Sequence, residues 1–120
     1  MMTTQPITIK NRQVVIHTNG NGVWLTQSQI ADLFGVFTAA VNANIRAICK
    51  SGVLDEDRVV RRTRCRNGNI VERYSLEMIA ALAFRLKSEN AEVFRRWIVE
   101  GVTTPAIIWK MLIVNDGVLN

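Results

Sequence analysis

The spacing of apolar residues between positions 25 and 48 predicts two short helices joined by a tight turn. The first helix begins after Thr26, because its hydroxyl can accept an amide of the first turn and Gln29 completes a capping-box pattern. Gly35 ends this helix, since glycine supplies the backbone freedom that a tight inter-helix turn needs. Ala31 is small where the two helices must approach closely. We expect the wedge between the helices to be filled by Ile30, Phe34, Val36, Val41 and Ile45.

The second predicted helix starts at Thr38, which can cap it, and continues to about Lys50 before residues 51–52 stop it. Its apolar residues follow the i, i+4, i+7 spacing of one buried face. The inward residues are therefore Val41, Ile45 and Ile48. The residues of the opposite face are Thr38, Ala39, Asn42, Ala43, Arg46 and Lys50.

Two helices at this spacing are typical of a helix-turn-helix, whose second helix can lie in the major groove of DNA. Thr38 and the alanines of the outward face are small enough to permit close approach to a groove. Asn42 can make the two-pronged contact that an adenine edge offers, and Arg46 or Lys50 can reach phosphate or guanine. The alternative for these residues is a solvated helix face, because the first two turns carry no positive charge.

Positive charge is concentrated in residues 58–73, which hold six arginines and a single acid, Glu72. The resulting net charge of +5 equals the formal net charge of the whole 120-residue chain, so the remainder is balanced. A concentrated basic patch indicates a polyanionic partner. The acids just before it, residues 55–57, are expected to form a solvated loop or to cap a short helical turn. The arginines are Arg58, Arg61, Arg62, Arg64, Arg66 and Arg73.

The dipeptide Asn67-Gly68 predicts a β-hairpin within this basic segment, because both residues tolerate the positive φ of a type I′ turn. A two-residue loop places four arginines on one side of the ribbon, whereas a three-residue loop would reverse one strand relative to the other. A cationic hairpin after a helix-turn-helix is the layout of a winged helix, in which the wing lies along phosphates or enters the minor groove. The alternative is a charged edge that protects the sheet. The arginines on that side would be Arg62, Arg64, Arg66 and Arg73. In this register Arg62 lies opposite Arg73, and Arg64 lies opposite Val71.

The remaining patterns complete an α+β fold. Two β-prone runs, residues 7–10 and 14–17, are expected to form a small N-terminal hairpin. Ser75 caps a helix that is apolar on most sides and therefore central. A last helix, residues 89–100, is expected to turn Arg95 outward with its neighbour Arg96. The inward residues of that helix are Ala91, Phe94, Trp97 and Ile98.

Residues 1–120 are expected to form one domain with a core of about residues 7–102 and a C-terminal tail, residues 103–120. The tail's apolar run, residues 106–114, is too brief to be assigned to helix or strand by its period. If it were left exposed, this run would form an apolar patch that promotes association. It therefore either docks on this domain or pairs with a second copy in a homodimer. No stretch can span a bilayer and no secretory signal begins the chain, so we expect a cytoplasmic protein without membrane contact.

Residues suited to catalysis or metal binding are sparse. His17 is the only histidine and there is no CxxC pair, so we expect no zinc site from this chain alone. Cys49 and Cys65 form either one disulfide or, in a reducing compartment, two small buried thiols. The chain has no carboxylate pair at a recognisable spacing and no glycine-rich phosphate loop. We therefore expect neither enzymatic activity nor a cofactor.

Four stretches follow one another along the chain: VWLTQSQIADLFGV, NIRAICKSGVLDED, a basic hairpin ending in ERYSLEMIAALAFRL, and FRRW. In this order they resemble the RhuM family, a group of bacterial virulence-associated proteins regarded as DNA-binding, over roughly residues 15–100. The resemblance implies a helix-turn-helix domain that recognises DNA or regulates expression. Family members are usually longer, so the chain is expected to correspond to their N-terminal domain or to a short relative.

The chain departs from the RhuM pattern at two places. The second helix begins with the uncharged residues 37–40, where family members carry a polar or basic stretch, and the resemblance fades after Trp97. A weaker likeness to phage antirepressor domains exists around IADLFGV and NIRAI. These features leave a second interpretation open, an antirepressor-like interaction module that binds an acidic protein surface.

The predicted fold is α+β and winged helix-turn-helix-like, mainly helical, with a small N-terminal hairpin and an arginine-rich hairpin as the wing. The predicted function is sequence-specific or general binding of double-stranded DNA by a transcriptional regulator of RhuM type. The predicted DNA contacts are Thr38, Asn42, Arg46, Lys50, Arg62, Arg64, Arg66 and Arg73.

Overall fold

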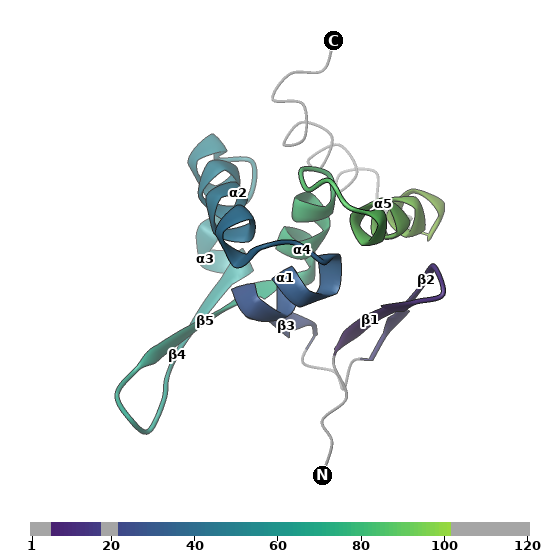
Figure 1. Cartoon of the computed structure of the whole chain (residues 1–120). Coiled ribbons are helices and arrows are strands. Elements are labelled where there is room, and N and C mark those ends of the chain that lie inside the picture. The colour runs from purple at the N-terminus through teal and green to yellow at the C-terminus, as the bar shows by residue number, and fades with distance from the viewer. Residues whose placement is uncertain (1–5, 18–21, 102–120) are drawn as a thin grey trace.

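The structure, a computed structural model, describes residues 6–17 and 22–101. Within them the chain is a mixed α+β fold of five helices and two small antiparallel sheets, which confirms the predicted class at this level (Figure 1). The predicted tail and its apolar run, on which the predicted homodimer contact depends, lie outside the described residues. The elements in chain order are β1 (Ile7–Lys10), β2 (Gln13–Ile16), β3 (Trp24–Leu25), α1 (Gln27–Phe34), α2 (Thr38–Ser51), α3 (Glu56–Val59), β4 (Val60–Arg64), β5 (Ile70–Ser75), α4 (Leu76–Ala83) and α5 (Glu89–Gly101).

The N-terminal hairpin of β1 and β2 forms as predicted, with its second strand beginning one residue earlier. Asn11 and Arg12 occupy its turn at φ angles of 52° and 60°, the positive values that a two-residue type I′ turn requires. Arg12 then reaches α5, where its Nη1 lies 3.0 Å from Glu89 Oε2. Figure 1 shows this hairpin beside α5, on the opposite side of the molecule from β4 and β5.

Helix α1 begins and ends as its sequence predicts. Thr26 Oγ1 accepts a hydrogen bond from the Gln29 amide at 3.2 Å, and Gln29 Oε1 accepts one from the Thr26 amide at 2.9 Å. This capping box satisfies two amides that helix geometry leaves without partners. Gly35 closes the helix in the left-handed conformation, with φ at 67°. The tight turn therefore depends on a glycine at position 35.

Helix α2 begins at Thr38, but the predicted capping role of Thr38 is wrong. Phe37 holds the N-cap position in an extended conformation and makes no side-chain capping bond. Its carbonyl accepts the amides of Ala40 and Val41, at 3.0 and 3.2 Å, so the helical pattern starts one residue before a Thr38 cap would allow. The predicted inward residues Val41, Ile45 and Ile48 are at most 5% exposed.

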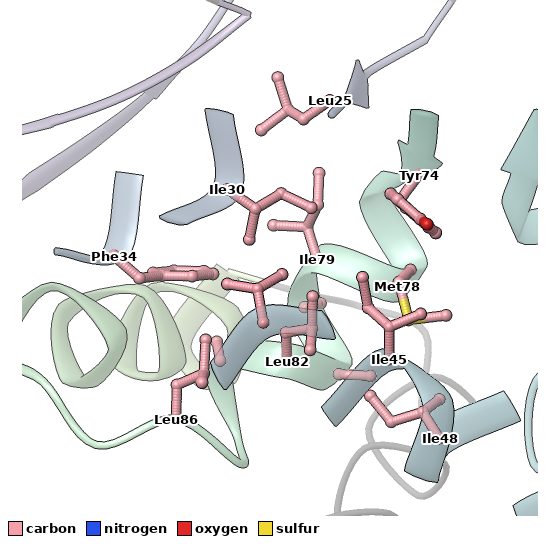
Figure 2. Close-up of a cluster of buried hydrophobic side chains, with 14 of the residues drawn as sticks. Leu25, Ile30, Phe34, Ile45, Ile48, Tyr74, Met78, Ile79, Leu82 and Leu86 are labelled. Carbon is pink, nitrogen blue, oxygen red and sulfur yellow. The ribbon is translucent and has the colours of Figure 1, made fainter. Parts of the chain in front are cut away.

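The central position predicted for the helix after Ser75 is confirmed. Every residue of α4 from Met78 to Ala83 is buried, and Figure 2 shows Ile79 between side chains of α1, α2 and β3. Arg95 does not face outward as predicted, because its Nη1 donates to the carbonyls of Ala83 (2.6 Å) and Leu86 (3.0 Å). These carbonyls lie at and beyond the end of α4, where helical partners run out.

Strand β3 is an element that the sequence pattern did not predict. Its two residues pair with the end of β5, with Trp24 opposite Ser75 and Leu25 opposite Tyr74. The second sheet therefore has three strands in the order β3-β5-β4. This pairing ties the residues just before α1 to the base of the arginine-rich hairpin. Figure 1 shows the free end of that hairpin projecting away from the helices.

Candidate nucleic-acid interface

The outward face of α2 is as predicted. Burial of its three inward residues fixes the rotation of the helix about its axis, which leaves the opposite residues at the surface. Asn42 is half-buried, and the other five members of this face are exposed. Three of the six members of this face, Thr38, Asn42 and Arg46, are spaced by four residues and form one stripe along the helix.

The turn of the β4–β5 hairpin has three residues, so the predicted two-residue loop is wrong. The Cys65 amide donates to the Asn69 carbonyl at 2.7 Å, and the Gly68 amide donates to the Cys65 carbonyl at 3.0 Å. Gly68 has a φ of 89°, which suits the left-handed position of a three-residue hairpin loop. Asn67 Oδ1 also accepts the Asn69 amide at 2.9 Å and stabilises this longer turn.

The longer turn changes which arginines share a side of the sheet. Arg62 lies opposite Glu72, and Arg61, rather than Arg62, lies opposite Arg73. Directly opposed residues point to the same face, so the predicted gathering of Arg62, Arg64, Arg66 and Arg73 on one side is wrong. We call one side the inner face, formed by Val60, Arg62, Arg64, Ile70, Glu72 and Tyr74. The outer face is formed by Arg61, Thr63, Val71 and Arg73.

Arg62 is held by two carboxylates at the inner face. Its Nε lies 2.8 Å from Glu72 Oε2, and its Nη2 lies 3.0 Å from Glu56 Oε2 on α3. The hydrogen bonds to Glu56 and then Glu72 raise the pKa of the guanidinium further above its ordinary value. Arg62 is thus the arginine of the hairpin whose charge is already compensated within the described structure.

A chain of hydrogen bonds continues from Glu72 to the outward face of α2. Tyr74 Oη donates to Glu72 Oε1 at 3.0 Å and accepts from Gln27 Nε2 at 3.2 Å. Gln27 Nε2 also donates to Asn42 Oδ1 at 3.1 Å. We call these residues, together with Arg62 and Glu56, the α2–hairpin network. It connects the candidate recognition helix, the first turn of α1 and the sheet.

This network lies in a groove of about 380 Å³ between α2 and the inner face. Thr38 lies at a second, more open hollow of about 630 Å³, formed with the first turn of α1 and hairpin residues 70–72. Residues from the outward face of α2 and from the inner face of the hairpin therefore border a shared concave surface. The residues that line the smaller groove are Gln27, Asn42, Ile45, Arg46, Cys49, Glu56, Val60, Arg62, Glu72 and Tyr74.

The other arginines of the hairpin differ from Arg62. Within residues 22–101 no carboxylate lies within ion-pair distance of Arg64, Arg66 or Arg73. Arg64 is on the inner face and Arg66 is in the turn, whereas Arg73 is on the outer face. On that outer face the Arg61 guanidinium carbon also lies 4.0 Å from the centre of the Trp24 ring, a cation–π contact.

Burial raises the pKa of two groups beside the groove. The pKa of the Cys49 thiol is raised mainly by burial and secondly by the Glu56 carboxylate, so the thiol stays protonated at neutral pH. The pKa of the Tyr74 phenol is likewise raised mainly by burial. The hydrogen bond from Gln27 opposes this shift, and the hydrogen bond to Glu72 adds to it.

The stability of the protein is expected to fall as pH rises past about 10, the ordinary pKa of tyrosine. The pKa of Tyr74 is higher in the folded state than in the unfolded state. Unfolding therefore releases this proton at alkaline pH, and a rising pH favours unfolding. Because Tyr74 is the only tyrosine, phenolate absorbance reports its titration alone. The midpoint should lie above about 10, and Tyr74→Phe should show a shallower alkaline decline in urea unfolding. A midpoint at or below that value contradicts this assignment.

Sequence reasoning missed most of the α2–hairpin network. Gln27 and Tyr74 lie 47 positions apart, and no local pattern links them. One signal was present, because Glu72 is the single acid within an arginine-rich segment. An acid placed there indicates a specific cationic partner, and that partner is Arg62. The acidic cluster before it does cap a helical turn, through Asp55 Oδ1 and the Asp57 amide.

Other chemistry is limited in the part of the chain that the structure describes. Cys49 and Cys65 are half-buried free thiols, rather than a disulfide. Across residues 6–17 and 22–101, no three His, Cys, Asp or Glu side chains gather to hold a metal ion. The helices of this same part include none that is long and apolar enough to cross a bilayer. Comparison of the chain with known protein families, with curated proteins and with solved structures gives no match.

Proposed function

We propose that this chain is a DNA-binding module of the winged helix-turn-helix type. In this proposal α2 lies in the major groove and the end of the β4–β5 hairpin lies on the neighbouring backbone. The element order β3-α1-α2-α3-β4-β5 supports it, because a strand, two helices, the short helix α3 and a hairpin follow one another, and the three strands form one sheet. The resemblance to the RhuM family supports a role in transcriptional regulation.

One observation carries the proposal. The outward face of α2 and the inner face of the hairpin border the same concave surface, which Arg46 lines from the helix and Arg62 from the hairpin. Arg46 and Lys50 are exposed on the helix, and Arg64 and Arg66 are exposed on the hairpin. Within the described residues none of these four has an ion-pair partner, so their charges are available to phosphates.

Among the predicted DNA contacts, the geometry distinguishes two residues from the rest. Arg62 is compensated by Glu56 and Glu72, and we propose that it positions the hairpin relative to the helices. Arg73 lies on the outer face and is turned away from α2. The proposed contacts are therefore Thr38, Asn42, Arg46, Lys50, Arg64 and Arg66.

The proposal is tested by titrating a random-sequence duplex with the protein at several salt concentrations. If four cations each neutralise one phosphate, the slope of log K against log salt should be about −3.6. A steep slope at low salt supports the proposal. Absence of any complex at micromolar protein and low salt contradicts it.

The second candidate is a module that binds an acidic protein surface. It is favoured by the start of α2, whose exposed residues Thr38 and Ala39 are uncharged where direct reading of guanine or phosphate would use a cation. In this case the exposed arginines of the hairpin would pair with carboxylates of the partner. Failure to bind duplex, together with retention on an acidic protein matrix that is lost with salt, would favour this candidate.

A further inference from the structure

An exposed aromatic ring precedes α2. Phe37 is 86% exposed, whereas the next most exposed large hydrophobic side chains in the described ranges, Val99 and Ile70, are 58% and 56% exposed. Phe37 also holds an N-cap position, where Ser, Thr, Asp or Asn would satisfy a free amide and Phe does not. The ring thus stabilises neither the core nor the helix end, and its placement favours a role in binding.

Small exposed residues of α2 follow Phe37 along the chain. Thr38, Ala39 and Ala43 are all exposed, and we call these three residues together with Phe37 the α2 patch. Phenylalanine, the threonine methyl and alanine are side chains that contact the C5-methyl group of thymine in the major groove. The N-terminal residues of a recognition helix are also the ones that reach base edges.

The charges beside the α2 patch favour a duplex over an apolar pocket of a protein partner. Arg46 and Lys50 follow the patch on the same exposed face of α2. On the hairpin, Arg64 of the inner face and Arg66 of the turn are also exposed. An apolar half that faces base edges and a basic half that faces phosphates match the two kinds of surface that a major groove presents.

We propose that the α2 patch reads thymine methyl groups in the major groove. This inference rests on the proposed function and adds a sequence preference to it. Asn42 lies between Ala39 and Ala43 on the same face and can contact the adenine of a neighbouring pair. The uncharged start of α2 is then a device for selecting A·T pairs.

The test compares thymine with uracil, which lacks only the C5-methyl group. A preferred site is first selected from a random duplex pool and then synthesised in two forms, with thymine or with uracil throughout. Each lost methyl contact should weaken binding roughly three- to fourfold, so two contacts predict roughly tenfold tighter binding of the thymine form. Phe37→Ala should reduce this ratio, because it removes the ring from the methyl contact and leaves the uracil complex nearly unchanged. Val99→Ala, which removes another exposed apolar side chain on α5, should leave the ratio unchanged.

The outcomes separate this inference from the function on which it rests. If no duplex is bound, the proposed function fails and the inference fails with it. If duplex binding is salt-dependent but no site is selected, or both forms bind equally, only the thymine reading is overturned. An undiminished thymine-to-uracil ratio in Phe37→Ala overturns the part assigned to the ring.

Discussion

Replacing Arg64 and Arg66 together with alanine should weaken duplex binding on the order of 50-fold at about 0.1 M salt and reduce the salt slope by about 1.8. Both residues are exposed, lie at the end of the hairpin and have no carboxylate partner in the described structure. If each neutralises one phosphate, each substitution removes about 0.9 from the slope. Salt titration of a fluorescent duplex, followed by anisotropy, measures both quantities.

The matched control is Arg61→Ala with Arg73→Ala. It removes the same charge from the same hairpin, but from the outer face of its two strands. General attraction to DNA should fall equally in the two double variants, so any difference between them reports direct contacts. We expect the control to change the slope by much less. Equal effects would contradict the assignment of the inner face to DNA, and circular dichroism would check that loss of the Arg61–Trp24 contact leaves the fold intact.

The helical part of this fold could be predicted from sequence because its signals are local and repeated. The capping box of Thr26 and Gln29, and Gly35 after it, fix the bounds of α1 within ten residues. The spacing of Val41, Ile45 and Ile48 sets the buried face of α2 and therefore the outward face as well. Each of these features depends on neighbours within four residues.

The hairpin could not be predicted to the same degree, because one residue in the turn decides every pairing. Asn67-Gly68 suits a two-residue loop, but Gly68 instead closes a three-residue loop with the Asn67 side chain on the Asn69 amide. That change moves each residue of β5 to the other face relative to β4. The difference determines whether Arg62 meets Arg73 or Glu72, and hence whether its charge is available.

The candidate site also depends on contacts between distant segments. Strand β3 has two residues, which is too short for an alternating pattern, and it forms because β5 offers a free edge. Gln27 acquires its role only when α1 brings it to both Asn42 and Tyr74. Such hydrogen bonds follow from the tertiary packing and leave no periodic signal in the chain.

Substitution of Phe34 with alanine should lower the free energy of unfolding by about 3–5 kcal/mol. In a domain of ordinary stability this loss leaves part of the population unfolded. Phe34 is fully buried at the end of α1, and its ring packs edge-on against Phe94 of α5 with centroids 5.6 Å apart. Its removal leaves a cavity where these two helices meet and loses an aromatic pair. Urea unfolding followed by far-ultraviolet circular dichroism measures the change, and Phe34→Leu should cost less because it fills more of the space.

Phe37→Ala is the matched control, three residues further along the chain and on the other side of Gly35. Its ring is 86% exposed, so we expect a change in unfolding free energy within about 0.5 kcal/mol. The same substitution should nevertheless reduce the preference for thymine over uracil. A large loss of stability in Phe37→Ala would show that the ring packs on the protein, and the α2 patch would then be a structural feature. Phe34→Ala should thus change stability, whereas Phe37→Ala should change base preference. These separate effects would distinguish Phe34, which holds α1 against α5, from Phe37, which we propose contacts DNA.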